Sequence, residues 1–461
     1  MKSEQERHAG PGSPPEAWEP LSRVTRAATI PVLRFMRIEA ASGVLLLVAT
    51  VSALLLANSS LAAGYSNFWE APVAISVGPL ALERSLRWIV NDGLMVIFFF
   101  VVGLEIRREM YAGALATWRG AALPMAAAAG GMLVPALVYI VVAGAPETRS
   151  GWGVPMATDI SFALGIFALL GKRVPVSLRV LLLAVAVIDD VGAILVIGLF
   201  YSSGVSLPGL LVAGVALVAI VVLQRMGVRA KFAYVVCALV AWAAIYSAGI
   251  HPTIAGVLVG LLTPVRAWFG PQGFVTDVQR HLEPLSDADA VSPEEFQRSL
   301  NLVDVARREA LSPAESLIES LHSWVAFGIM PLFALANAGV LLSGEALEAH
   351  GAVAAGVALG LLVGKPVGVL GFSWLALKCR VAILPDLLSG RHLVLLGCVT
   401  AVGFTMSLFI GQIAFSDAGA LGAAKLGVLA ASGVAAGATL LLGRFLLPGE
   451  QARLDAAQRA G

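Results

Sequence analysis

Residues 186–192 read Ala-Val-Ile-Asp-Asp-Val-Gly, and they lie in the middle of an apolar run that extends from 176 to 200. Crossing the hydrocarbon core of a bilayer takes roughly 20 apolar residues, so this run predicts a transmembrane helix. A charge at the bilayer centre costs at least ~2.5–3.5 kcal/mol on insertion scales. A chain that keeps two adjacent carboxylates, Asp189 and Asp190, at this depth has to pair them or use them.

The two carboxylates are suited to competition between protons and a metal ion. Adjacent side chains project about 100° apart on a helix, so Asp189 and Asp190 do not both face lipid. Burial and mutual repulsion favour the protonated form of a carboxyl group, and hard cations prefer oxygen ligands. We therefore expect the pair to hold protons near neutral pH and to release them to a cation. The alternative is a static pair that is salt-bridged for folding.

The composition also indicates a membrane protein. The chain has 461 residues, of which 58% are hydrophobic and 13% charged, whereas a soluble domain carries about a quarter charged residues. Its net charge of +1 provides no basic surface for nucleic acid. Cys237, Cys379 and Cys398 are scattered and match no zinc spacing, so we expect neither a disulfide framework nor a structural metal. Residues 1–33 are polar and lack the apolar core of a signal peptide, and we interpret them, like 448–461, as cytoplasmic tails.

About a dozen apolar runs predict an all-α polytopic membrane protein with about 12 transmembrane helices. The predicted spans are 40–58, 87–108, 120–143, 152–171, 176–200, 207–224, 231–248, 249–264, 323–342, 352–378, 391–415 and 424–446. Lys and Arg follow every second span, whereas opposite loops such as 201–206 and 343–351 carry almost none. By the positive-inside rule, both termini are predicted in the cytoplasm, and the membrane is the plasma membrane (the inner membrane of a Gram-negative cell).

Two long stretches between the spans have a different character. Residues 59–86 lie on the outside, and their alternating apolar residues around a Gly-Pro turn predict a short β-hairpin. Residues 267–318 are charged and predicted to be a cytoplasmic linker, amphipathic or partly disordered. This linker separates a first membrane part of about eight helices, 34–266, from a second part of about four, 319–447.

Other ionisable residues at membrane depth are Asp92, Glu105, Asp159 and Lys365. Lys365 is flanked on both sides by apolar or small residues of the tenth run. Its ammonium is placed to neutralise one carboxylate of the acidic pair or the partly negative end of an interrupted helix. The alternative is a lysine that snorkels to the interface.

Two spans have centres that disfavour a continuous helix. The fourth reads Gly-Trp-Gly-Val-Pro-Met-Ala-Thr-Asp-Ile-Ser at 151–161, where Pro155 lacks a backbone donor and Thr158 and Asp159 are polar. The eleventh reads Gly-Phe-Thr-Met-Ser at 403–407. Unwound backbone at membrane depth is tolerated where it lines a cavity, so the two centres together predict a midplane binding site. Each alone is equally typical of an ordinary kinked helix.

An ordered set of motifs over roughly residues 33–447 resembles the bacterial Na⁺/H⁺ antiporters of the NhaA type. Besides the two interrupted segments and the acidic pair, the set comprises Phe35-x-x-x-Glu39-x-x-x-Gly43, Ala57-Asn58-Ser59, Trp88-Ile-Val-Asn-Asp92-Gly-Leu-Met, Val-Gly-Leu-Glu105-Ile-Arg-Arg-Glu109, Pro331-Leu-Phe-Ala-Leu-Ala-Asn337-Ala-Gly and Gly364-Lys365-Pro366. The resemblance implies twelve helices with an inverted-repeat core, for which this family is a known example. It also implies that the fourth and eleventh helices are broken and cross, that no cofactor is used, and that a homodimer forms through the hairpin at 66–86.

The resemblance further implies roles for the residues of the site. Asp190 resembles the principal cation-binding carboxylate, with Asp189 and Thr158 beside it holding the transported Na⁺. Lys365 resembles the partner that leaves Asp189 during turnover. Asp159 resembles the countercharge for the two helix N-termini at the crossing.

Further residues match the family's pH-response positions: Glu105, Glu109 and His251. His251 is equally typical of a satisfied core histidine, and the two glutamates are equally typical of helix-end charges beside Arg107 and Arg108.

One segment departs from the family pattern. Residues 317–322 read Leu-Ile-Glu-Ser-Leu-His, whereas family members commonly have Leu-Glu-His-x-Leu-His. Ile318 and Glu319 replace the Glu and the first His of that motif. Part of the usual pH-sensing cluster is therefore missing, and we expect a shifted pH range.

The function that these residues predict is the extrusion of Na⁺ or Li⁺ in exchange for external protons. Two carboxylates loading two protons per sodium would make the exchange electrogenic. The expected partners are these ions and membrane lipid, not nucleic acid. One alternative is an intramembrane aspartyl protease in which Asp159 and Asp189 face each other, although the chain lacks a Gly-x-Gly-Asp motif. Another is a passive channel or a scaffold.

Overall fold

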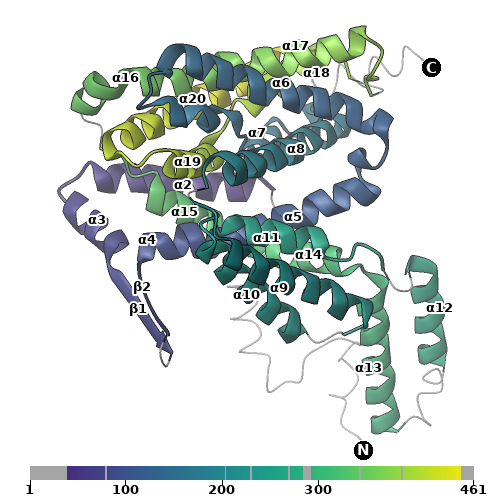
Figure 1. Ribbon diagram of the computed structural model, residues 1–461. Helices are drawn as coiled ribbons and strands as arrows, with labels where there is room; N and C mark the ends of the chain where they lie inside the picture. The colour runs from purple at the N-terminus through teal and green to yellow at the C-terminus, as the bar shows by residue number, and fades with distance from the viewer. Residues whose placement is uncertain are drawn as a thin grey trace, which may run out of the picture.

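The computed structural model describes residues 39–447 except 78–79, 203, 229–230, 268–269, 284–291, 342–343 and 386–387. The predicted tails, 1–33 and 448–461, lie outside the described residues. The long helices run side by side along one common direction, which is horizontal in Figure 1. The β-hairpin projects from one end of this bundle, and α12 (Gly270–Leu282) and α13 (Pro293–Ala310) project at the other end.

The part of the chain before α12 supplies the first set of elements. They are α2 (Glu39–Ala57), α3 (Ala62–Glu70), β1 (Pro72–Val77), β2 (Leu80–Ser85), α4 (Leu86–Trp88), the π-helical turn η3 (Ile89–Leu94), α5 (Met95–Ala112), the 3₁₀ turn η4 (Ala114–Ala116), α6 (Trp118–Ala143), the 3₁₀ helix η5 (Arg149–Met156), α7 (Ile160–Leu170), the 3₁₀ turn η6 (Gly171–Arg173), α8 (Val176–Phe200), α9 (Leu207–Arg225), α10 (Lys231–Ser247) and α11 (Thr253–Leu262). The antiparallel register of β1 and β2, with Pro72 opposite Ser85 and Val77 opposite Leu80, confirms the predicted hairpin.

The part after α13 supplies the second set. These elements are α14 (Pro313–Trp324), the π-helical turn η8 (Val325–Ile329), α15 (Met330–Asn337), α16 (Gly344–Leu359), the π-helical turn η9 (Gly360–Gly364), α17 (Lys365–Lys378), α18 (Gly390–Thr400), α19 (Phe404–Ala414) and α20 (Ala418–Leu446). In three dimensions α17 packs on α6, α16 on α20, α11 on α5 and α2 on α7. Helices from both parts of the chain therefore form one bundle.

The helices have the length and composition of membrane spans. Among the described residues, 8 helices are long and apolar enough to cross a bilayer, and up to 10 if each of two bent pairs counts as one span. Two shorter apolar helices, Phe232–Ser247 and Thr253–Leu262, add to these. The chain is thus a mostly helical, multi-pass membrane protein with one small sheet.

The predicted span at 323–342 was placed too far along the chain. The structure starts this helix at Pro313 and ends it at Asn337. Ser312 and Glu315 form a capping box, in which each side chain accepts a hydrogen bond from the other residue's backbone N–H. This local signal begins the helix in a polar segment, whereas the apolar run starts only later.

Close backbone contact between α6 and α17 fixes the position of Lys365. A Cβ on Gly130 would lie 2.1 Å from the carbonyl oxygen of Gly368, so only glycine fits there. Small residues commonly permit such contacts between membrane helices. Lys365 lies about one turn before Gly368 on α17, and a Cβ on Gly131 would lie 3.8 Å from its Cε.

Candidate functional site

The interruptions in two spans lie against each other inside the bundle. Residues 157–159 separate η5 from α7, and residues 401–403 separate α18 from α19, where the chain bends by 45°. The N–H of Asp159 donates to the carbonyl oxygen of Val402 over 2.8 Å. Four helix ends therefore meet at one place: the N-termini of α7 and α19 and the C-termini of η5 and α18. The N-termini carry partial positive charge and the C-termini partial negative charge.

Asp159 joins the two helix N-termini at this crossing. One carboxylate oxygen accepts a hydrogen bond from the N–H of Phe162 at 3.0 Å, which caps α7. The other oxygen accepts from both the N–H of Thr405, at 3.0 Å, and its hydroxyl. The Asp159 side chain is completely buried, and its charge is compensated by two helix ends. Because both oxygens are engaged, the carboxylate is not presented to Asp189, as an aspartyl protease would require.

Asp189 binds Lys365 across the interior. The ammonium nitrogen lies 3.1 Å from Asp189 Oδ2, and the same oxygen accepts a hydrogen bond from the Thr158 hydroxyl at 2.7 Å. The ammonium also donates to the carbonyl oxygen of Met156, the last residue of η5, where the partial charge is negative. Asp189 and Lys365 are buried to 1% and 0% exposure, so this is a dry ion pair.

Asp190 is equally buried but lacks such partners. Neither of its carboxylate oxygens has a hydrogen-bond partner among the described residues, and the same holds for Asp189 Oδ1. The charged groups that act on it are mainly acidic: Asp189, Glu105 and Asp159, opposed by Lys365. A buried carboxylate without a donor is strongly disfavoured as a free anion. Asp190 is therefore placed to carry either a proton or a metal cation.

The predicted pH-response glutamates lie on α5 and differ in their contacts. Glu105 is partly buried and acts electrostatically on Asp190. Glu109 accepts a hydrogen bond from the N–H of Ala114 at 2.9 Å and lies 4.0 Å from Arg108. Glu109 thus also closes the turn that follows α5.

His251 makes its contacts apart from the acidic pair. Its Nε2 lies 3.4 Å from a carboxylate oxygen of Asp92, and its Nδ1 lies 2.8 Å from the hydroxyl of Thr253. Its ring packs edge-on against Phe409 of α19, with the ring centroids 5.3 Å apart. The structure therefore joins His251 to a second intramembrane acid, Asp92, which sequence reasoning had not paired with it.

Further polar residues support the site without having been predicted. The hydroxyl of Ser432 on α20 accepts a hydrogen bond from the N–H of Phe404 at 3.1 Å and so assists Asp159 in capping α19. Asn91, Asn337 and Gln412 bind one another through their amide groups. A polar residue inside an apolar helix is a visible signal for each of them, but the sequence does not show which partner it meets.

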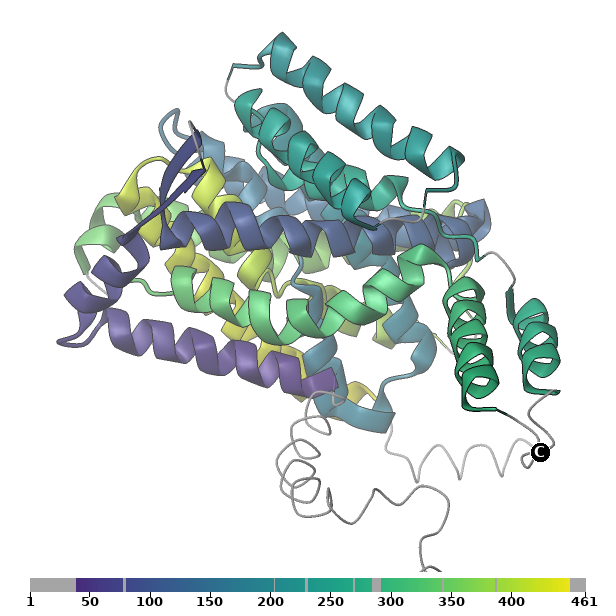
Figure 2. The ribbon, with the colours of Figure 1, turned by 90° about the horizontal axis from the view of Figure 1, so that it is seen from below.

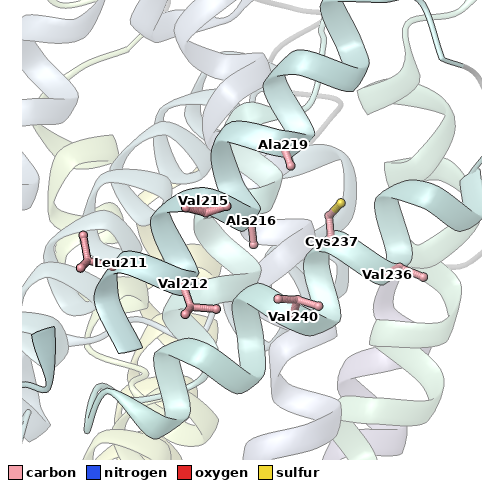
Figure 3. Close-up of a pocket in the computed structure, with 8 residues that line it drawn as sticks. All are labelled: Leu211, Val212, Val215, Ala216, Ala219, Val236, Cys237 and Val240. Carbon is pink, nitrogen blue, oxygen red and sulfur yellow. The ribbon is translucent and has the colours of Figure 1, made fainter. Parts of the chain in front are cut away.

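A cavity elsewhere in the bundle has the wrong chemistry for ions. It lies between α9 and α10, has a volume of about 390 Å³, and is lined by aliphatic side chains such as Val215 and Val240, together with Cys237 (Figure 3). Hard cations need oxygen ligands, which this lining does not offer. The crossing of the interrupted helices is thus the better candidate for ion binding.

One family model and several known proteins are similar to this chain. Residues 33–442 match the family described as Na⁺/H⁺ antiporter 1. The chain is 60% identical over 455 residues to an Na⁺/H⁺ antiporter NhaA 2 of Myxococcus xanthus, with 97% of both chains covered. It is 49% identical to one of Sorangium cellulosum, covering 96% of both chains. It is 43% identical to an Na⁺/H⁺ antiporter NhaA of a Janthinobacterium species, covering 94% of this chain and 97% of the relative.

Proposed function

The chain belongs to the Na⁺/H⁺ antiporter 1 family and exchanges Na⁺ for H⁺ across a membrane, and we propose that the exchange takes place on Asp189 and Asp190. The observation that carries this assignment is the set of buried carboxylate oxygens without donors: both oxygens of Asp190 and Oδ1 of Asp189. The hydroxyl of Thr158 is already bound to Asp189 and adds a further oxygen. Oxygen ligands of this kind suit Na⁺ and Li⁺.

Competition at these oxygens drives the proposed cycle. From the cytoplasm, Na⁺ binds to the deprotonated pair, and Lys365 leaves Asp189 as the cation takes its place. One part of the bundle then moves against the other, Na⁺ leaves to the outside, and protons return to the carboxylates. A cation and protons share the same oxygens, so they occupy the pair in turn and not together.

The stoichiometry follows from the number of carboxylates in the pair. Two protons for each Na⁺ transfer one net positive charge inward per cycle, so the membrane potential drives extrusion together with the pH gradient. This exchange serves sodium and pH homeostasis. Li⁺ is carried at the same oxygens, and glutamates on α5 together with His251 adjust the response to pH.

The proposed architecture is that of the family. It comprises twelve helices with an inverted-repeat core, a feature for which this family is a known example. Both termini lie in the cytoplasm of the plasma membrane, the inner membrane of a Gram-negative cell. The basic ends of the spans, such as Arg107 with Arg108 and Lys172 with Arg173, support this orientation. A homodimer forms through the β1–β2 hairpin.

Substitution of Asp190 tests the assignment directly. In proteoliposomes that hold a pH gradient, addition of Na⁺ to the wild type should dissipate the gradient, as seen by dequenching of a pH-sensitive dye. Asp190→Asn removes the negative charge that Na⁺ requires and should reduce this response to background. Glu294→Gln, on the exposed surface of α13, is the matched control and should respond like the wild type. Normal exchange by Asp190→Asn would disprove the assignment.

A further inference from the structure

Three amide side chains from distant parts of the chain are bound to one another. Asn91 lies in the π-helical turn η3, Asn337 is the last residue of α15, and Gln412 lies on α19. The amide nitrogen of Asn91 donates to Gln412 at 2.5 Å and to Asn337 at 3.3 Å, Asn337 donates back to Asn91 at 2.7 Å, and Gln412 donates to Asn337. We call these three residues the amide cluster, and it joins α19 to both η3 and α15.

The amide cluster lies at the end of the bundle that carries the β1–β2 hairpin. The turn η3 follows the hairpin by way of the short α4, and the span α14–α15 ends at Asn337. Figure 2 shows the spans α4–α5 and α14–α15 running side by side toward the hairpin. Asn337 is completely buried, whereas Asn91 and Gln412 are half-buried. The cluster therefore lies between the interior of the bundle and its surface at the hairpin end.

An aromatic layer lies next to the amide cluster, on its inner side. Phe409 of α19 precedes Gln412 by three residues, which places it about one turn nearer the helix crossing. Its buried ring packs against Phe99 of α5 and Phe333 of α15, with the ring centroids 5.2 and 6.1 Å apart. The helix α19 therefore meets the same two spans in two successive layers, one apolar and one of hydrogen-bonded amides.

The helix α19 connects the amide cluster with the helix crossing. Thr405 and Gln412 are seven residues apart, roughly 10 Å along the helix, and nearly two full turns put them on the same face. Thr405 binds Asp159 at the crossing through its N–H and its hydroxyl. Asp92, next to Asn91 in the sequence, adds an ionisable side chain that is 16% exposed. Polar groups inside a membrane are rare and commonly mark the route of an ion, so this face of α19 is a candidate for the route to the hairpin side.

We propose that the amide cluster is a gate that closes the ion path at the hairpin end, and that Gln412 parts from Asn91 and Asn337 whenever Na⁺ passes there. This inference rests on the exchange at Asp189 and Asp190 that is proposed above. A cation held near the crossing reaches the hairpin end along this route only if α19 separates from the two neighbouring spans.

The chemistry of the amide cluster suits a gate that opens in every cycle. Among the described residues, its amide groups bond to one another and to the carbonyl oxygen of Phe333. Water can replace such hydrogen bonds with little net change in free energy, whereas a buried amide without a partner is disfavoured. The cluster is therefore stable when it is closed and dry or open and wet. The split falls at α19, because α19 packs mainly on η5 and α20, whereas η3 and α15 pack on each other.

Cysteine cross-linking of the full chain in proteoliposomes tests the gate. In a variant whose native cysteines are replaced by serine, one pair combines Asn337→Cys with Gln412→Cys and spans the split. The control pair combines Asn91→Cys with Asn337→Cys, which lie on one side of the split. A short bifunctional thiol reagent with a reducible disulfide joins each pair. Linking 337 to 412 should reduce Na⁺/H⁺ exchange to near background, and reduction should restore it. The linked control pair should keep the rate that it had before linking.

A second variant tests the gate without cysteines in the cluster. Gln412→Leu keeps a side chain of similar size and removes its hydrogen bonds, so it favours the open gate. The apparent affinity of a ligand depends on the fraction of protein that exposes its site. In vesicles of known protein orientation, the half-maximal Na⁺ concentration on the hairpin side should fall several-fold relative to that on the opposite side. Asn58→Leu is the matched control, because Asn58 donates to the carbonyl oxygen of Val340 at 2.7 Å and joins α2 to the segment after α15, on one side of the split. It should leave this ratio unchanged.

Three results would overturn the gate: undiminished exchange after complete linking of 337 to 412, an equal loss in both linked pairs, or an unchanged ratio in Gln412→Leu. Asp190→Asn separates this failure from a failure of the ion site. If the protein linked between 337 and 412 still exchanges while Asp190→Asn does not, the gate is wrong and the ion site stands. Normal exchange by Asp190→Asn would disprove the ion site, whatever the links do.

Discussion

Asp159 and Asp190 are equally buried, but the protein surrounds them in opposite ways. Both oxygens of Asp159 accept hydrogen bonds from the N-terminal ends of α7 and α19. Neither oxygen of Asp190 accepts any among the described residues. Several donors and two helix N-termini stabilise the charged form of Asp159, and its hydrogen bonds hold the crossing together. A carboxylate without donors is disfavoured as a free anion, so the difference supports a structural role for Asp159 and the transport role that we propose for Asp190.

The charge balance around the acidic pair of α8 is tested most strongly through Lys365. Lys365→Met removes the cation that compensates Asp189, and leaving a charge unpaired in the interior destabilises a protein by roughly 3–5 kcal/mol. We expect a large fall in melting temperature in detergent. The double variant Asp189→Asn with Lys365→Met should recover most of that loss, because no charge then remains unpaired. Equal destabilisation by the single and double variants would show that packing of the lysine, not its charge, matters.

The capping role of Asp159 at the helix crossing is tested by Asp159→Ala. This change removes the cap of α7 and the shared acceptor at α19, and losing a cap costs about 1 kcal/mol per helix. We expect a loss of stability of about 2 kcal/mol, accompanied by slower exchange because the crossing is less well ordered. Thermal unfolding of the purified protein measures the loss of stability. An unchanged melting temperature would contradict a capping role.

Asp190→Asn should give the smallest change in stability and the clearest contrast. The carboxylate makes no hydrogen bond that the substitution can break, so the melting temperature should stay at the wild-type value or rise at alkaline pH, where the wild type has to ionise the buried group. Exchange should nevertheless be lost. A fall as large as that of Asp159→Ala would mean that Asp190 also holds the fold together.

The positions of most spans and of both helix interruptions were predictable from the sequence. Apolar runs defined the spans, as at 176–200, where α8 has the predicted bounds. Pro155 with the polar residues Thr158 and Asp159 predicted the first interruption, and the Gly-Phe-Thr-Met-Ser segment at 403–407 predicted the second. The start of α14 was missed, since its capping box lies in a polar segment.

The side-chain contacts between distant helices were harder to predict than the positions of the helices along the chain. The sequence shows that Asp159 and Asp190 are charged residues in apolar surroundings, but it does not show which of them receives hydrogen bonds. The contact of Ser432 with the N-terminus of α19 and that of His251 with Asp92 depend on how distant helices pack. Local propensity carries no information on such pairing.

Titration calorimetry of Na⁺ binding to the purified protein tests the central claim most directly. If Na⁺ and protons compete for the Asp189–Asp190 oxygens, Na⁺ binding releases protons, and the apparent affinity for Na⁺ falls as pH falls, by up to roughly tenfold per pH unit for each proton displaced. The measured heat should then change with the ionisation enthalpy of the buffer. Binding of Na⁺ whose heat and affinity are the same in every buffer and at every pH would contradict the account.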